Sequence, residues 1–408
     1  MRIRRRTLRS NWGGVRLAGA AVFAVALAGC VTNPTATDLE PSAVTTEKPQ
    51  ASVPTTTSTE RSVARTIIHE GEKRIVSSVE LNRLENSDYD ASQMYGNYKV
   101  VWESGEGNGV IVRRVSDDAV VLKLKDPGAK RYLAKALVLN DAVYVVDSPN
   151  YDELEEAPSR LFRYDLKSKT REEIAPPPGE SWTKWGSLLT EAHGSIWWLV
   201  DRRGQDEEKN TSCLVKIDDT ESALWYCPKS KNLSFIKNSD NGVSVLTLPE
   251  DQSEDSCSEQ FEISIDGENI RRIGSGDPCM SYTGFSIAGW DVWHELSKDE
   301  PGYLAESVIY ADGPNGERLQ FDLAVSNSLT SCRGAVFWLT RAEESETEKR
   351  GDHLIRWVPG EKNTTVIAVS EPSAAAGGLK CANGYLTWGK IVTDRDPPLE
   401  INYYIDLN

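Results

Sequence analysis

The chain has 408 residues, with 46 Lys and Arg against 62 Asp and Glu and a formal net charge of −16. The first 29 residues hold six Arg and no acidic residue, which leaves 40 basic and 62 acidic residues, or −22, on the remainder. Because a surface this acidic repels phosphates, we expect no nucleic-acid partner and no docking on anionic lipid through basic patches.

Residues 1–29 have the layout of an export signal. Six Arg accompany an apolar run over residues 17–27, which is short for a membrane span. The ending Leu27-Ala28-Gly29-Cys30 resembles the bacterial lipobox. That resemblance implies a lipoprotein whose Cys30 receives a diacylglycerol thioether, with palmitate as the expected acyl chain, and becomes the mature N-terminus. It implies a lipid-anchored protein on the extracytoplasmic face of the cell membrane. The alternatives are an ordinary secretory signal with an incidental Cys and a retained membrane helix.

Residues 30–62 are expected to form a tether that begins with the lipidated Cys30. Sixteen of the thirty residues from 31 to 60 are Ser, Thr or Pro, and no apolar period is present. Such a composition cannot bury enough apolar surface to fold, so it predicts a disordered spacer. Thirty residues of flexible chain have an average end-to-end distance of roughly 30 Å.

Residues 63–408 carry a repeat. A turn residue followed by a short aliphatic or aromatic run recurs seven times, at intervals of 43 to 53 residues. The apolar residues that open these runs are Val100, Val143, Ile196, Val243, Val292, Val336 and Leu386. A hairpin pattern with its own turn residues follows later in the units, over residues 111–124, 161–174, 213–227, 261–273, 307–321 and 353–369.

A period of 45 to 50 residues with four short strands is typical of a propeller blade. The sequence therefore predicts an all-β, seven-bladed β-propeller, in which neighbouring sheets bury one another and the many Trp side chains fill the wedges between them. The seventh unit ends after one strand at 401–407, so we expect residues 63–68 to add its outermost strand and close the ring. Two β-sandwiches are the alternative, although they do not explain the regular interval. The repeat resembles seven-bladed propellers in general and lacks the motifs of named subclasses, so it assigns no function.

Six Cys remain after Cys30, and an even number in an exported protein predicts three disulfides. In an antiparallel hairpin, directly opposed residues share a constant index sum, which pairs Cys213 with Cys227 and Cys257 with Cys279 across their turns. The last two cysteines occupy equivalent places in adjacent units, so they are expected to link neighbouring blades: Cys332 and Cys381. Because no Cys-x-x-Cys pair exists, a zinc site is not favoured.

Catalytic and metal signatures are missing from the sequence. The four His are spaced unlike metal ligands, and we interpret each as an ordinary strand or loop residue: His69, His193, His294 and His353. Acidic clusters at 152–156, 206–208 and 343–346 are expected to be solvated loops on one face of the ring, where they could bind a cationic partner. Nothing indicates a cofactor, a metal or a catalytic residue.

Three functions fit these patterns. The first is a non-catalytic binding or scaffold module, displayed on a tether, for an envelope protein or polymer. The second is a propeller enzyme acting on extracytoplasmic lactones or glycans at its axial channel. We disfavour it because the expected inner strands, such as 136–139 and 187–190, are mostly apolar or small. The third is capture of a small solute.

Overall fold

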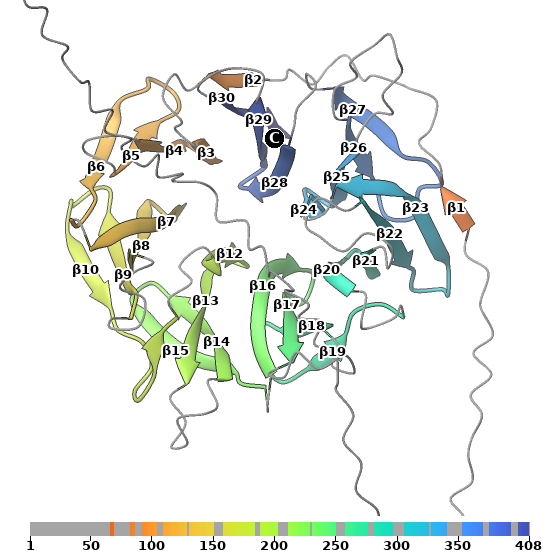
Figure 1. Cartoon of the computed structure of the whole chain (residues 1–408), viewed down its shortest axis with the longest axis horizontal. Helices are drawn as coiled ribbons and strands as arrows, with labels where there is room; N and C mark the ends of the chain where they lie inside the picture. Colours follow the sequence, from red (N-terminus) through yellow and green to blue (C-terminus); the bar gives the residue numbers. More distant parts are fainter. Residues whose placement is uncertain are drawn as a thin grey trace, which may run out of the picture.

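Seven antiparallel sheets stand around a common axis in the computed structural model, and each is built on four strands (Figure 1). The structure describes residues 66–68, 82–85, 92–103, 109–128, 130–150, 158–183, 188–202, 211–228, 231–249, 258–275, 281–296, 306–325, 328–340, 353–369, 375–392 and 399–407. No helix within these ranges is long and apolar enough to cross a bilayer. The seven sheets confirm the predicted seven-bladed β-propeller.

Within each sheet, the strands follow one another from the axis of the ring to its rim. The innermost are β3 (Ser92–Tyr95), β7 (Arg131–Leu139), β12 (Thr190–Ala192), β16 (Lys231–Ser239), β20 (Ser281–Ile287), β24 (Thr330–Cys332) and β28 (Ala375–Ala382). The second strands are β4 (Tyr98–Glu103), β8 (Ala142–Pro149), β13 (Ser195–Arg202), β17 (Gly242–Pro249), β21 (Trp290–Leu296), β25 (Ala335–Thr340) and β29 (Tyr385–Val392).

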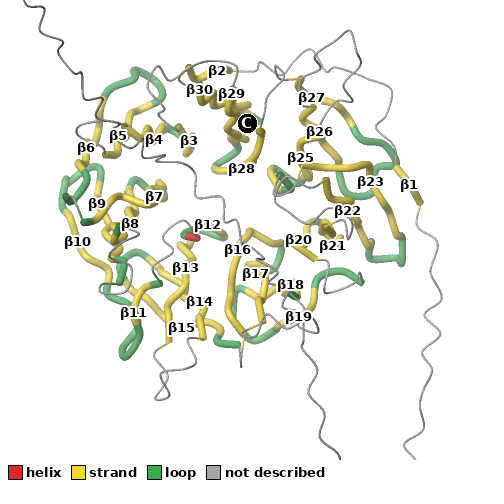
Figure 2. The backbone as a smooth tube through the Cα atoms, viewed as in Figure 1, coloured by secondary structure: helices red, strands yellow, loops and turns green. Residues whose placement is uncertain are grey.

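The third strands are β5 (Gly109–Arg114), β9 (Arg160–Asp165), β14 (Thr211–Asp218), β18 (Glu259–Ser264), β22 (Glu306–Asp312), β26 (His353–Trp357) and β30 (Leu399–Asp406). The outermost are β6 (Val120–Lys125), β10 (Arg171–Ile174), β15 (Glu221–Tyr226), β19 (Ile270–Arg272), β23 (Arg318–Val325), β27 (Thr365–Val369) and β2 (Asn82–Glu85). Two short strands are added to this plan: β1 (Thr66–Ile68) and β11 (Ser181–Trp182). Figure 2 shows that strands and their connecting loops account for nearly all of the described chain.

The seven apolar residues that open the repeats all lie on second strands, and each has a relative exposure of 0%. A second strand has a strand on either side and a neighbouring sheet on both faces, so a continuous apolar run is stable there. The tight turns that precede these residues use left-handed backbone, as at Asn383 (φ 49°) and Gly384 (φ 84°). Such turns match the twist of the strands that they join.

The ring is closed by strands from both ends of the described chain, although by a different segment from the one predicted. β2 pairs antiparallel with β30, with Arg83 opposite Tyr403. The expectation that residues 63–68 fill this position is wrong, because β1 pairs in parallel with β23 at the rim of the fifth sheet. β2 comes only six residues before β3 in the chain, a length typical of a connection between adjacent elements. Closure by β2 therefore needs a short connection, whereas closure by β1 needs a long one.

Aromatic side chains fill the space between sheets, as the Trp content predicts. Trp290 of the fifth sheet packs edge-to-face on Trp357 of the sixth, with ring centroids 5.2 Å apart. Phe321 lies 5.3 Å from Trp338 and 5.0 Å from Trp357 across the same joint. Each such pair contributes roughly 0.5–1.5 kcal/mol beyond the burial of its area. The hydrophobic core of the molecule therefore lies between neighbouring sheets.

Candidate functional site

A cavity of about 160 Å³ lies among the innermost strands, near the axis of the ring. Five of the seven sheets contribute to it, through β12, β16, β20, β24 and β28. Most of its lining side chains are polar or charged: Thr190, Glu191, Lys237, Asn238, Phe285, Thr330, Ser331, Lys380, Cys381 and Asn383. We refer to this space as the axial cavity. Because its walls come from strands held in separate sheets, its shape is fixed by the closed ring.

Three lysines on innermost strands come close to one another at this place. They are Lys135 on β7, Lys237 on β16 and Lys380 on β28, from the second, fourth and seventh sheets. In each strand the pairing register shifts directly before the lysine, and ladder pairing resumes at the lysine itself. β-bulges bend a strand and redirect its side chains, and they occur often beside functional sites. A bulge thus precedes each of the three lysines, as one also precedes Thr283 on β20.

Lys135 and Lys380 are in direct side-chain contact. Burial first, and then the charge and hydrogen bond of Lys380, hold the pKa of Lys135 well below its usual range, and Lys237 adds to the effect. Burial and the like charges of its neighbours thus disfavour the charged form of the Lys135 amine.

Lys237 shares this electrostatic environment. Burial, followed by the charge of Lys380, lowers its pKa from 10.5 to about 8. The charge of Lys237 reaches outward to His294 on β21, whose pKa falls to about 3, mainly because the ring is fully buried. The His294 Nδ1 lies 2.8 Å from Ser307 Oγ, which fixes the imidazole in the core. Neutral His294 is a structural residue, as the sequence interpretation expects.

Glu191 is the acidic residue on the wall of the axial cavity. Burial raises the pKa of its carboxyl, while a 3.4 Å hydrogen bond from the Gly194 backbone N–H and the charge of His193 lower it. His193 itself lies in the turn after β12, and its Nε2 is 2.6 Å from the Ser239 carbonyl oxygen. Glu191 and His193 thus belong to the joint between the third and fourth sheets.

A second, wider pocket of about 530 Å³ lies beside this joint, lined by His193, Asp240, Asn241, Glu262, Ser264, Ile265, Asp266, Asn269 and Arg271. Two of its charged residues, Arg271 and Glu262, are paired with each other. The Arg271 guanidinium donates to Glu262 at 2.8 Å and, through two nitrogens, to both oxygens of Asp291 at 2.8 Å. Glu262 is 3% exposed and also accepts from Ser239 Oγ at 2.5 Å. This network joins the fourth and fifth sheets, so we assign it a structural role.

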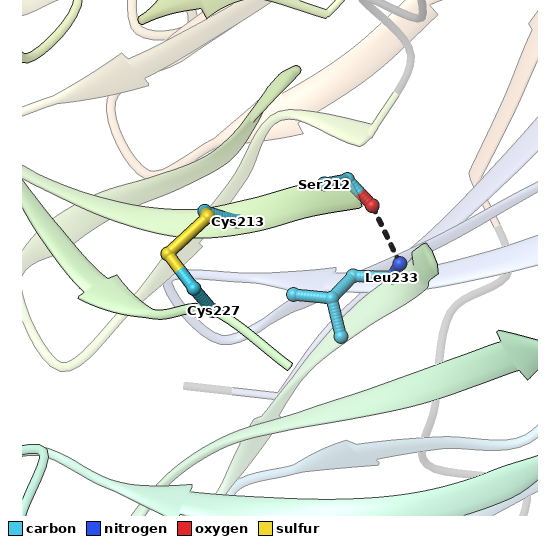
Figure 3. Close-up of a disulfide and its surroundings, with 4 residues drawn as sticks. All are labelled: Ser212, Cys213, Cys227 and Leu233. Atoms are coloured by element: carbon cyan, nitrogen blue, oxygen red, sulfur yellow. Dashed lines mark hydrogen bonds between the residues drawn. A yellow bond between two sulfur atoms is a disulfide. The ribbon is translucent and has the colours of Figure 1, made fainter. Parts of the chain in front are cut away.

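The predicted disulfide within the third sheet is confirmed. Cys213 on β14 and Cys227 just after β15 are bonded, with Cα atoms 4.3 Å apart (Figure 3). The index sum of 440 also holds for the neighbouring pair Leu214 and Tyr226. Beside the disulfide, the Leu233 backbone N–H of β16 donates to Ser212 Oγ at 2.6 Å (Figure 3). The outer hairpin of the third sheet is therefore covalently closed where it meets the fourth.

The predicted disulfide between neighbouring sheets is also present. Cys332 ends β24 and Cys381 lies on β28, with Cα atoms 5.5 Å apart, so the bond joins the innermost strands of the sixth and seventh sheets. Cys381 follows Lys380 directly and lines the axial cavity. This bond fixes the backbone from which Lys380 extends.

The remaining predicted residues fall outside the described ranges. These are the lipidation site Cys30, the cysteine pair Cys257 and Cys279, His69 and the three acidic clusters. His353 is 5% exposed and pairs with Thr340 within its sheet, as a strand residue. Within the described ranges, no cluster of three or more His, Cys, Asp and Glu side chains has the arrangement of a metal site.

The sequence interpretation did not single out these three lysines, although the segment 136–139 that it expected as an apolar inner strand does lie on the innermost strand β7. Lys135 directly precedes the segment 136–139 that was predicted as an inner strand, and β7 extends back to include it. One signal was readable: Gly377 and Gly378 stand shortly before Lys380, and glycine inside a strand often marks a bulge. Nothing local marks the bulges before Lys135 and Lys237 as clearly.

No protein-family model and no curated protein matches this chain. Among solved structures it is similar to the β-propeller domain of the Trilobed protease from Pyrococcus furiosus, with a TM-score of 0.50 and 11% identity over 78% of this chain and 96% of that one. An oligogalacturonate lyase from Vibrio parahaemolyticus is also similar, with a TM-score of 0.47 and 11% identity over 80% and 96% of the two chains. At such identities the likeness shows the fold alone, a β-propeller.

Proposed function

We propose that this chain is a lipid-anchored binding protein of the cell envelope, whose propeller holds an envelope protein or polymer without altering it. In this proposal Cys30 carries the lipid on the extracytoplasmic face of the cell membrane. Residues 31–62 then act as a tether that gives the propeller reach. The observation that supports the binding role best is the axial cavity, to which five sheets bring polar and charged side chains.

A rigid ring with a polar hollow at its axis suits recognition. The walls of the cavity are preorganised by the closed ring and by the disulfide between Cys332 and Cys381, so little ordering is lost when a ligand enters. The cavity gathers amines, although residues 30–408 together carry a formal net charge of −22. This contrast of charge distinguishes the axis from the rest of the molecule.

The anchor and the binding role are tested separately. Mass spectrometry of the protein from membranes should find an N-terminal diacylglyceryl Cys30, and Cys30→Ser should release the protein from the membrane. Affinity recovery from envelope extract should retain one protein or polymer in constant stoichiometry on the wild-type chain and lose it on Lys380→Met. Recovery of no stoichiometric partner, together with turnover of a lactone or glycoside, would replace the binding role with the enzymatic alternative.

A further inference from the structure

We propose that the axial cavity is a receptor for an oxyanion, a carboxylate or phosphate group carried by the ligand, which Lys237 and Lys380 contact with Lys135 beside them. The inference deepens the proposed function and rests on it for the source of the ligand. It concerns the chemical group that the site selects.

The arrangement of like charges is the first support. Three amines from three different sheets are brought together, and the charges that lower the pKa of Lys135 are those of Lys380 and Lys237. Gathering cations in a confined space opposes folding, and an anion placed among them reverses the sign of that interaction. Each lysine directly follows a register shift, where the ladder pairing of its strand is interrupted. A binding site for an anion explains why three amines are gathered near the axis.

The neighbouring polar groups are the second support. Asn238 and Asn383 offer amide donors, and Thr330 and Ser331 offer hydroxyl donors around the cavity. Burial raises the pKa of Glu191, which also lines the cavity. The lining can thus complete the hydrogen-bond shell of an oxyanion.

The size of the cavity limits the ligand. Its volume of about 160 Å³ is small for a ligand pocket, since sites for drug-sized ligands run to roughly 300–1,000 Å³. That is room for one carboxylate or phosphate with its hydration, and too little for a folded peptide segment. We therefore infer that the anion is an end group or side group of a larger ligand that lies across the mouth of the cavity.

Calorimetric titration of the full-length chain in detergent tests the inference. The probes are inorganic phosphate and D-glucuronate, with D-glucose as the uncharged match for glucuronate. We expect phosphate or glucuronate to bind and glucose to show no heat. Lys380→Met and Lys237→Met should each weaken binding at least tenfold, while Lys125→Met, on the exposed outermost strand β6, should change it less than twofold. Circular dichroism of each variant excludes loss of fold.

The two anions separate the possible sources, since phosphate alone indicates a phosphate-bearing polymer and glucuronate alone indicates a uronic acid or other carboxylate. Binding of neither anion overturns the inference, and so does equal binding of glucose and glucuronate or equal weakening by Lys125→Met. If envelope extract yields the same partner on wild type and Lys380→Met, the proposed function stands and this inference fails. If the anions bind but no envelope partner is recovered, this inference stands and the proposed function fails.

Discussion

Replacing Lys380 with Met should make the propeller more stable, although it removes a charge from the proposed binding site. Lys380 is in side-chain contact with Lys135, and its charge also lowers the pKa of Lys237. Met keeps most of the length of the lysine side chain and removes the ammonium group. The variant therefore isolates the repulsion that the folded ring imposes on the amine cluster.

The expected gain follows from Coulomb's law. Two unit charges 4 Å apart repel by about 1 kcal/mol in bulk water and by about 4 kcal/mol at an effective dielectric constant of 20. Lys380 is exposed to solvent, so solvent screening places the effect near the lower end. We expect the free energy of unfolding to rise by about 1–2 kcal/mol. For a ring of this size that corresponds to a rise in Tm of roughly 1–3 °C.

The effect of Lys380→Met on stability should depend on pH. The folded-state pKa of Lys237 is about 8, below its unfolded value of 10.5, so the native state loses the proton first and its repulsion is relieved as the pH rises through 8. The gain from Lys380→Met should therefore be full at pH 7 and shrink toward pH 10. The unfolded state binds more protons in this window, so wild-type stability gains a contribution there.

Urea unfolding followed by tryptophan fluorescence measures this, at pH 7 and pH 9.5 and at low and high salt. The matched control is Lys125→Met, the same substitution on an outermost strand, which should stay within 0.5 kcal/mol of wild type. A loss of stability in Lys380→Met, or a gain that is equal at both pH values, would refute the view that like-charge repulsion acts in the axial cavity.

Three further changes probe the frame of the site. The double change Cys332→Ser and Cys381→Ser, which opens a loop with a sequence separation of 49, should cost about 4 kcal/mol in urea unfolding, and an unchanged midpoint would contradict the role of this bond. Arg271→Met leaves Glu262 buried without its cation and should lower the free energy of unfolding by about 3–5 kcal/mol. Adding Glu262→Gln to this variant should restore part of that stability, whereas a double variant that loses the sum of the two single losses would argue against the ion pair. Replacing Asn82–Glu85 by a proline-rich sequence bares the edge of β30 and should produce oligomers in size-exclusion chromatography, whereas the same replacement in β1 should not.

The architecture of the ring was readable because it repeats. Each unit needs an apolar second strand, and residues such as Val143 and Ile196 recur at nearly constant intervals since every sheet meets the same packing demand on both faces. The cysteine pairs followed from the same regularity: opposed positions in a hairpin for Cys213 and Cys227, and equivalent positions in adjacent sheets for the pair that joins them. A constraint that acts locally or at a fixed period leaves its pattern in the sequence.

Ring closure and the axial cavity were decided by tertiary structure. The sequence suggested residues 63–68 for the last strand, and only the placement of the first sheet beside the seventh favours Asn82–Glu85 instead. The three clustered lysines are far apart in the chain, by up to 245 residues: Lys135, Lys237 and Lys380. A lysine on a strand ordinarily faces water, so its position in the sequence does not indicate a cluster. The three lysines form a cluster because the ring brings their sheets around one axis. Local sequence propensity cannot predict this cluster, because the cluster depends on the angles between all neighbouring sheets around the ring.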